Sequence, residues 1–222
     1  MRSLFLAVAL SLAAPMASAA APMAPDNTEA HYQALLATAK ATAPKADWGA
    51  LRLAYSRRAG FRAFAQSAAK RQMFEAAQNG DCAAALPAAR AALEAAYIDI
   101  DAHLVAAFCE DAAGDKTAAQ LDRDIGAGLV ASIETGDGLS TGSAFTPIDV
   151  DEEYAVMRAL GAHVTDQALV QSDGHSYDAL TTVDQAGHKA TYYFLIDRVL
   201  AGEAAALKPG SVSEGGPPGR SP

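Results

Sequence analysis

The spacing of apolar residues changes near Thr135, and this change constrains the fold of the 222-residue chain more than any other feature. Before Thr135, apolar residues recur every three or four positions, as they do along one face of a helix. After it, short β-branched and aromatic segments are separated by turns that contain Gly and Asp. The sequence therefore predicts an α+β protein, with helical hairpins over 28–135 packed on a small antiparallel sheet and one short helix over 136–207.

Individual elements can be placed within these two regions. In the first region, helices are predicted over 28–43, from Trp48 after an Asp47 cap, and over 65–79. In the second region, strands are predicted over 167–171, 175–183 and 191–196, with 144–150 as a candidate fourth strand. Between them, Asp151, Glu152 and Glu153 begin a short helix that we expect to cover one face of the sheet and to end at Gly161.

The helical region contains a short repeat. Two sets of residues match at an offset of 34 positions: Phe74, Gly80, Asp81, Ala84, Ala85 and Phe108, Gly114, Asp115, Ala118, Ala119. Each Gly suits the left-handed end of a helix, and each Asp can cap the next helix. The pattern resembles the tetratricopeptide repeat, which implies stacked helical hairpins. Because two repeats are fewer than the roughly three of a free-standing array, we expect them to pack on neighbouring elements.

The N-terminus has the features of a cleaved signal peptide. Arg2 precedes an uncharged apolar segment over 4–14, and Ala17-Ser18-Ala19 provides the small residues that signal peptidase recognises. A helix needs about 20 apolar residues to span a bilayer, and this segment is shorter. No Cys follows it to which a lipid could be attached. We therefore expect cleavage after Ala19 and a soluble protein in the periplasm or outside the cell. Residues 20–27 and 208–222 are predicted to be flexible because they are poor in large apolar residues.

The chain is acidic, with 26 Asp and Glu against 17 Lys and Arg and a formal net charge of -9. Nucleic-acid phosphates and anionic lipid surfaces both attract basic patches. We therefore expect neither nucleic acid nor a membrane as a partner.

The two cysteines, Cys82 and Cys109, predict a disulfide, since exported chains with an even number of cysteines commonly form one. If their helices form an antiparallel pair that turns near Tyr97, both cysteines lie at the same end of the pair. Two small buried thiols in an Ala-rich core are the alternative. A redox-active pair is not indicated, because there is no Cys-x-x-Cys motif.

The first candidate for chemistry is Gly138-Leu139-Ser140-Thr141-Gly142, which matches the Gly-x-Ser-x-Gly pattern of a nucleophile elbow. That elbow needs a strand before it and a helix after it. Here a helix precedes the motif and a strand is predicted after it. A flexible Gly-rich turn is therefore the better interpretation.

The second candidate is the hairpin around His175. This side chain could act as a base oriented by Asp178, but alternation along a strand places His175 and Tyr177 on one face and Asp178 on the other. The residues that remain as a candidate functional cluster are Asp137, Ser140, His175, Tyr177 and Asp178. We assign none of them a catalytic role, since packing and turn formation explain them more simply.

No metal or cofactor is indicated by the spacing of possible ligands. The five histidines, at positions 31, 103, 163, 175 and 188, do not pair at zinc-ligand spacing. Asp149, Asp151, Glu152 and Glu153 could hold Ca²⁺, but they lack the alternating pattern of a calcium loop. Capping of the following helix explains these four acids more simply.

Several short motifs occur together in a fixed order: Asp99-Ile100-Asp101-Ala102-His103, Gly136-Asp137-Gly138 with Ser140, Ala144-Phe145, Asp151-Glu152-Glu153-Tyr154 with Leu160-Gly161, Gln167-Ala168-Leu169, Gly174-His175-Ser176-Tyr177-Asp178, and Tyr193-Phe194 before Ile196-Asp197. In this order they resemble an uncharacterised family of exported bacterial proteins, catalogued as a domain of unknown function. The resemblance covers about 28–205. It implies no activity and no site residues. Leu195 and the two cysteines depart from the family pattern.

These observations predict a non-enzymatic periplasmic module that binds a protein or peptide. Stacked helical hairpins form a groove suited to peptides, and the sequence contains no coherent catalytic set. Two alternatives remain: a hydrolase-type enzyme that uses Gly136–Gly142 with His175 and Asp178, and a structural envelope protein. The sequence leaves the oligomeric state open.

Overall fold

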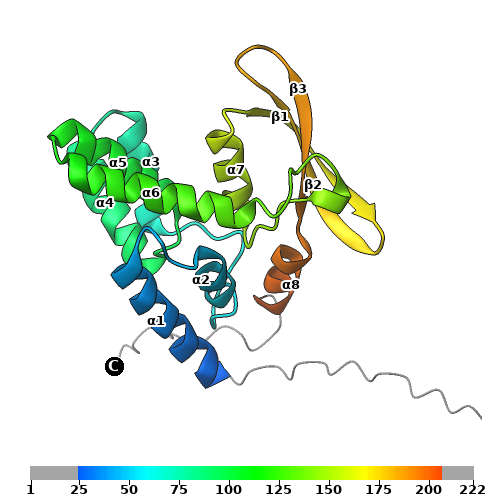
Figure 1. Cartoon of the computed structure of the whole chain (residues 1–222), viewed down its shortest axis with the longest axis horizontal. Helices are drawn as coiled ribbons and strands as arrows, with labels where there is room; N and C mark the ends of the chain where they lie inside the picture. The colour runs from blue at the N-terminus through cyan, green and yellow to red at the C-terminus, as the bar shows by residue number, and fades with distance from the viewer. Residues whose placement is uncertain (1–24, 207–222) are drawn as a thin grey trace, which may run out of the picture.

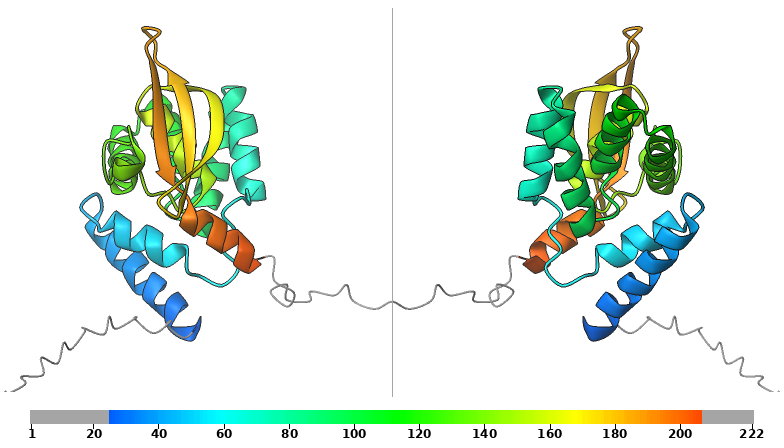
Figure 2. Two further views of the ribbon diagram at one scale, coloured as in Figure 1. Left: turned by 90° about the vertical axis from the view of Figure 1, so that its right-hand side faces the viewer. Right: turned by 90° about the vertical axis from the view of Figure 1, so that its left-hand side faces the viewer.

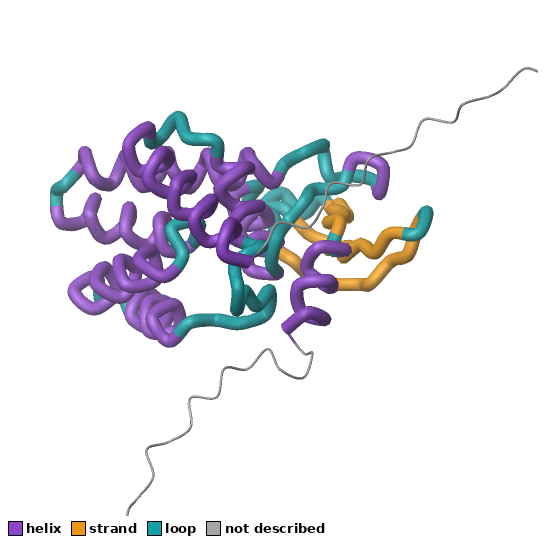
Figure 3. The backbone as a smooth tube through the Cα atoms, turned by 90° about the horizontal axis from the view of Figure 1, so that it is seen from below, coloured by secondary structure: helices purple, strands orange, loops and turns teal. Residues whose placement is uncertain are grey.

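A computed structural model describes residues 25–206 and divides into a helical side and a sheet side (Figure 1). The elements, in order, are α1 (Pro25–Thr42), α2 (Trp48–Tyr55), α3 (Ala68–Gln78), α4 (Cys82–Ala95), α5 (Ile100–Ala113), α6 (Lys116–Ile133), the 3₁₀ turn η1 (Thr141–Ser143), α7 (Val150–Ala159), β1 (His163–Ser172), β2 (His175–Val183), β3 (Lys189–Leu195) and α8 (Asp197–Ala206). The tube view shows most of the helices gathered on one side of the molecule and the strands on the other (Figure 3). The predicted fold class is confirmed.

The predicted repeat forms two helical hairpins, α3–α4 and α5–α6. Asp81 accepts a hydrogen bond from the backbone N–H of Ala84, and Asp115 accepts the equivalent bond from Ala118. The glycine before each Asp has a positive φ, 68° in the first turn and 89° in the second. Both turns therefore use the residues that the repeat predicts.

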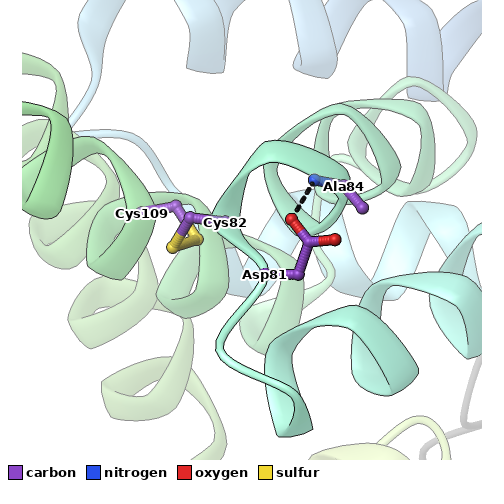
Figure 4. The surroundings of a disulfide bond; sticks show 4 residues. All are labelled: Asp81, Cys82, Ala84 and Cys109. Atoms are coloured by element: carbon purple, nitrogen blue, oxygen red, sulfur yellow. Dashed lines mark hydrogen bonds between the residues drawn. A yellow bond between two sulfur atoms is a disulfide. The ribbon is translucent and has the colours of Figure 1, made fainter.

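The disulfide is confirmed as well, and it ties the two hairpins together (Figure 4). Cys82 opens α4 next to the capping Asp81, and Cys109 lies late in α5. Their Cα atoms are 5.2 Å apart, so both cysteines lie at the same end of the α4–α5 pair.

One apolar core crosses the boundary that the sequence predicts near Thr135. It includes Leu51 of α2, Leu129 of α6, Val156 of α7, and Leu180 and Phe194 of the sheet. Its close packing is visible where α2 meets α6, since a Cβ on Gly128 would lie 2.4 Å from the Trp48 indole nitrogen. A smaller second core fills the space between the two hairpins.

The sheet is an antiparallel meander in the order β1-β2-β3. In its register Tyr177 pairs with Leu195 and Asp178 with Phe194. Helix α7 lies against the face that carries Leu180, on the side toward the helical hairpins (Figures 1 and 2). The expected short helix therefore covers one face of the sheet.

The predicted strand over 144–150 is wrong. Only Phe145 pairs with β3, through hydrogen bonds from its N–H to the Tyr193 carbonyl at 3.0 Å and from the Leu195 N–H to its own carbonyl at 2.8 Å. Pro147 has no N–H to continue such pairing. The segment therefore docks on the sheet edge with one residue and then enters α7.

The ends of the chain fall mostly outside the described residues. This applies to the predicted signal peptide over 1–19 and to the predicted flexible tail over 208–222. Helix α1 begins at Pro25, within the segment predicted to be flexible over 20–27, and α8 was not predicted. Within residues 25–206, no helix combines the length and apolar character that crossing a membrane requires.

Candidate functional site

A cavity of about 270 Å³ lies where the helical hairpins meet α7. Its walls come from the end of α2, the loop over 60–67, α3, the junction of α4 and α5, and the first turns of α7. Tyr55, Phe61 and Ile98 provide apolar surface, while Arg62, Lys70, four aspartates and Glu152 provide charge. Ligand sites often lie at such junctions between structural units, so this cavity is the candidate functional site.

Lys70 of α3 is the central charged group. Its Nζ lies 2.8 Å from Asp151 Oδ2, 3.0 Å from Asp99 Oδ2 and 3.4 Å from Asp101 Oδ2. Burial alone would lower the pKa of Lys70, but the three carboxylates outweigh burial and hold this pKa above its usual value. The side chain is therefore a fixed ammonium group, and it lacks the free amine that a nucleophilic lysine needs.

The four aspartates come from two helix starts with the same spacing. Asp99 caps α5 and Asp101 lies in its first turn, while Asp149 caps α7 and Asp151 lies in its first turn. Carboxylates are favoured at these positions because helix N-termini carry partial positive charge. Two Asp-x-Asp segments, 50 residues apart in the chain, therefore bring four carboxyl groups to one cavity.

Acidic groups outnumber basic ones around Lys70. Asp101 also pairs with Arg158, so Lys70 and Arg158 bond three of the four aspartates, and Asp149 forms no ion pair within the described residues. Burial, followed by the negative charge of Glu152, raises the pKa of Asp149 well above its usual value. An added cation would relieve this concentration of negative charge, whereas an added anion would increase it.

The Gly-rich loop satisfies its own polar groups. Asp137 accepts hydrogen bonds from the Ser143 hydroxyl at 2.5 Å and from the Leu139 N–H at 2.9 Å, and the Ser140 and Ser143 hydroxyls lie 2.8 Å apart. The loop is anchored where the Tyr193 N–H donates to the Gly138 carbonyl. Ser140 is thus part of a turn and has no basic partner among the hydrogen bonds of the described chain.

His175 and Asp178 lie on opposite faces of β2, as the alternation predicts. His175 Nδ1 is instead 2.6 Å from Asp197 Oδ2 at the start of α8. The hydrogen bond with His175, followed by the Ser176 N–H, lowers the pKa of Asp197. The register places Ala179, the partner of Tyr193, four residues beyond His175, which is about 14 Å along the strand. The Gly-rich loop and His175 are therefore anchored far apart.

Asp178 belongs to a buried acid pair that the sequence did not reveal. It accepts a hydrogen bond from Gln167 at 2.8 Å and faces Glu153 of α7. Burial, followed by the negative charge of Asp178, raises the pKa of Glu153 to about 9. Both Glu153 oxygens are buried without a hydrogen-bond partner among the described residues, which favours the uncharged form. The two acids meet where α7 packs on the sheet, and neither lines the cavity.

The four acids at the start of α7 that could hold Ca²⁺ point in different directions. Asp149 caps α7 by accepting from the Glu152 N–H, Asp151 pairs with Lys70, Glu152 pairs with Arg52, and Glu153 faces the sheet. Within residues 25–206, no group of three or more His, Cys, Asp or Glu side chains is placed to hold a metal ion.

Sequence reasoning missed the cavity because Lys70 carries no local signal. The repeated Asp-x-Asp spacing at two helix starts was the available clue, although each pair taken alone is an ordinary helix start. The family motif that begins at Asp99 contains one of these pairs, and its last residue is the buried His103. His103 bonds Asp122 and the Tyr97 carbonyl, so it supports the packing of the hairpin.

Comparison with known proteins bears on the family resemblance. A family model described as a domain of unknown function (DUF4919) matches residues 21–204. No curated protein and no solved structure matches the chain. The match spans the helical hairpins, the cavity and the sheet, and it confirms the resemblance drawn from the ordered motifs. The chain therefore belongs to the DUF4919 family.

Proposed function

We propose that the protein is an exported, non-enzymatic binding module and that its cavity receives the basic side chain of a peptide or protein partner. The observation that carries the proposal is the cavity itself, in which four aspartates surround one lysine that is already paired with three of them. The surplus of carboxyl groups favours a cationic guest.

The walls of the cavity support the same choice of ligand. Tyr55 and Phe61 meet edge to face, with ring centroids 5.7 Å apart, and both line the cavity. Aromatic rings attract alkylammonium and guanidinium groups through their negative faces. A volume of about 270 Å³ falls just below the range of about 300–1,000 Å³ for drug-sized ligands. A lysine or arginine side chain suits this space better than a large cofactor does.

Export forms part of the proposal. The predicted signal sequence over 1–19 suggests it, and the Cys82–Cys109 disulfide supports it because such bonds persist in oxidising compartments. Mass spectrometry of the protein recovered from the periplasm tests this directly. We expect a chain that begins at Ala20 with both cysteines oxidised. Retention of residues 1–19 on the recovered protein would contradict export by cleavage.

Calorimetric titration with N-acetyl-lysine amide tests binding, and the uncharged N-acetyl-norleucine amide serves as the matched ligand. We expect weak saturable binding of the lysine compound, in the range of about 0.1–1 mM for one side chain, and none of the norleucine compound. Asp151→Asn should weaken binding at least about tenfold, since it removes a charge from the cavity. Asp173→Asn, in the exposed β1–β2 turn, should leave it unchanged.

Equal heats for the two ligands would refute the proposed recognition of a basic side chain. Equal weakening by Asp173→Asn would show that general electrostatic attraction, rather than the cavity, causes the binding.

A further inference from the structure

We propose that the outer side of α5 is an interface on which a second copy of this chain docks, with α5 packed antiparallel to α5 across a twofold axis. Phe108 is 63% exposed and Leu104 is 38% exposed. They lie one turn apart, so they share one face of the helix. Single exposed apolar residues are common, but this pair occupies a position that the internal repeat defines.

The repeat shows what this face does in the first hairpin. The offset of 34 relates Leu104 to Lys70 and Phe108 to Phe74. On α3, Phe74 packs against the core between the hairpins, and Lys70 reaches Asp99 at the start of α5. This face of α3 is therefore the face that the next hairpin covers.

On α5 the same face has no following hairpin to cover it. After α6 the chain turns to η1, α7 and the sheet (Figure 1). Leu104 lies against α6, with its Cδ2 3.2 Å from the position that a Cβ on Gly126 would take, while Phe108 projects into solvent. Stacked repeats need a polar outer face at their ends to stay soluble. The α5 end lacks this polar face.

A second copy fits the exposed face by its geometry and charge. In an antiparallel α5–α5 pair, Leu104 of each copy lies opposite Phe108 of the other, which makes the contact self-complementary. Asp101 and Asp111, at either end of the pair, are already bonded to cations within their own chain. Each chain has two hairpins, so a dimer would bring four together, which exceeds the roughly three repeats that a stable array needs.

The C-terminal segment over 207–222 is a poor alternative occupant. It is rich in Gly, Pro and Ser and contains no aromatic residue, so it has few apolar side chains to bury against Leu104 and Phe108.

Sedimentation velocity of the purified protein between about 1 and 500 μM tests the interface, because weak dimers form over this range. We expect a concentration-dependent shift from monomer to dimer. Added salt should strengthen it, since both copies carry net negative charge. Phe108→Glu should raise the dissociation constant at least about tenfold. Leu169→Glu is the matched control, because this β1 leucine is 62% exposed and lies away from α5; it should leave the dissociation constant unchanged.

Circular dichroism should show that both variants fold, as expected for substitutions of exposed residues. Phe108→Glu should also leave lysine binding in the cavity unchanged, which separates this proposal from the proposed function. A mixture of Leu104→Cys and Phe108→Cys chains should cross-link more than either chain alone.

Three results would overturn the proposal. A protein that stays monomeric at every concentration would exclude a second copy as the molecule that covers α5. Equal weakening by Leu169→Glu would move the contact elsewhere. Cross-linking of each cysteine variant mainly with itself would exclude the antiparallel arrangement.

Discussion

The first turn of α7 meets a buried cation on each of two sides, and the two cations are satisfied differently. Toward the core, Glu152 forms a paired contact with Arg52, at 2.6 Å from Nε and 2.5 Å from Nη2. Toward the cavity, Asp151 shares Lys70 with Asp99 and Asp101.

Arg52 has a complete set of partners from three parts of the chain. Its remaining N–H groups donate to the Ser132 carbonyl and hydroxyl and to the Thr146 carbonyl. The second oxygen of Glu152 also accepts the Ile148 N–H. Charges match one to one: Glu152 lines the cavity, but its carboxylate is paired with Arg52, which is not among the lining residues. Such a saturated ion pair joins α2, α6 and α7 and serves the fold.

At Lys70, carboxylates exceed cations and a cavity adjoins them. The contrast shows that a buried ion pair alone does not mark a functional site. The feature that distinguishes the Lys70 cluster from the Arg52 ion pair is a surplus of carboxyl groups next to a cavity. This difference underlies the proposed binding of a basic side chain, and the variants below test it.

The largest effect is expected from Arg52→Met. It leaves Glu152 as a buried carboxylate without a cation, which should lower the free energy of unfolding by about 3–5 kcal/mol. Urea denaturation measures this change. Arg123→Met, whose half-exposed side chain lies 3.5 Å from Asp111, should cost no more than about 1 kcal/mol. Similar losses for the two variants would contradict the structural role of Arg52.

The next largest effect is a dependence of the free energy of unfolding on pH, caused by Glu153 of α7. Glu153 keeps its proton to about pH 9 in the folded protein, whereas it ionises near its ordinary pKa of 4.5 when unfolded. The folded state thus binds the extra proton between these pH values, so stability falls as pH rises, by about 1 kcal/mol per pH unit. Urea midpoints from pH 5 to 8 measure this slope.

Glu153→Gln should remove most of that slope, because a glutamine side chain is uncharged at every pH. The variant and the wild type should therefore be similar near pH 5, and the variant should be more stable near pH 8. A wild-type slope that survives the substitution would assign the pH dependence to other groups.

Lys70→Met tests the cavity side. It leaves three carboxylates without their shared cation, at a cost of about 2–3 kcal/mol near pH 7. The loss should be smaller than for Arg52, because the adjoining cavity provides space for water around the carboxylates. It should also shrink as pH falls and the carboxylates protonate. Added propylammonium should restore thermal stability to this variant but not to Arg52→Met. Equal rescue of both would remove the distinction between the two sides.

Local features of the sequence predicted much of the fold. The Gly-Asp turns of the repeat, the short β turns and the change of apolar period each depend on neighbouring residues. The disulfide followed from two helices and one turn. The prediction of a strand over 144–150 was wrong because its apolar residues are typical of a strand. Whether the segment pairs depends on the distant edge of β3, where only Phe145 docks before Pro147 interrupts the pairing.

The candidate site was less predictable, because its groups are distant in the chain. Lys70 of α3 meets Asp151 of α7 only once the chain has folded, since 81 positions separate them in the sequence. The nearby Asp178 was the candidate partner of His175 in the sequence, but the structure pairs His175 with Asp197, which follows β3. Alternation along β2 excluded Asp178 as the partner, but no local feature of the sequence indicated Asp197.

The smallest effect should come from Asp151→Asn, and its neighbour makes it informative. Asp151 is one of three carboxylates at Lys70, and its side chain is 34% exposed, so its loss should lower the free energy of unfolding by less than about 1 kcal/mol. Glu152→Gln, one residue further on, removes the only carboxylate that pairs with Arg52 in the described chain, and it should cost several times more. Denaturation of the two variants at pH 7 gives both values. If Asp151→Asn proves as costly as Glu152→Gln, the Lys70 cluster is as saturated as the Arg52 pair, and its aspartates serve the fold. If its cost is small while lysine binding is lost, the surplus carboxylates at Lys70 are available to a ligand.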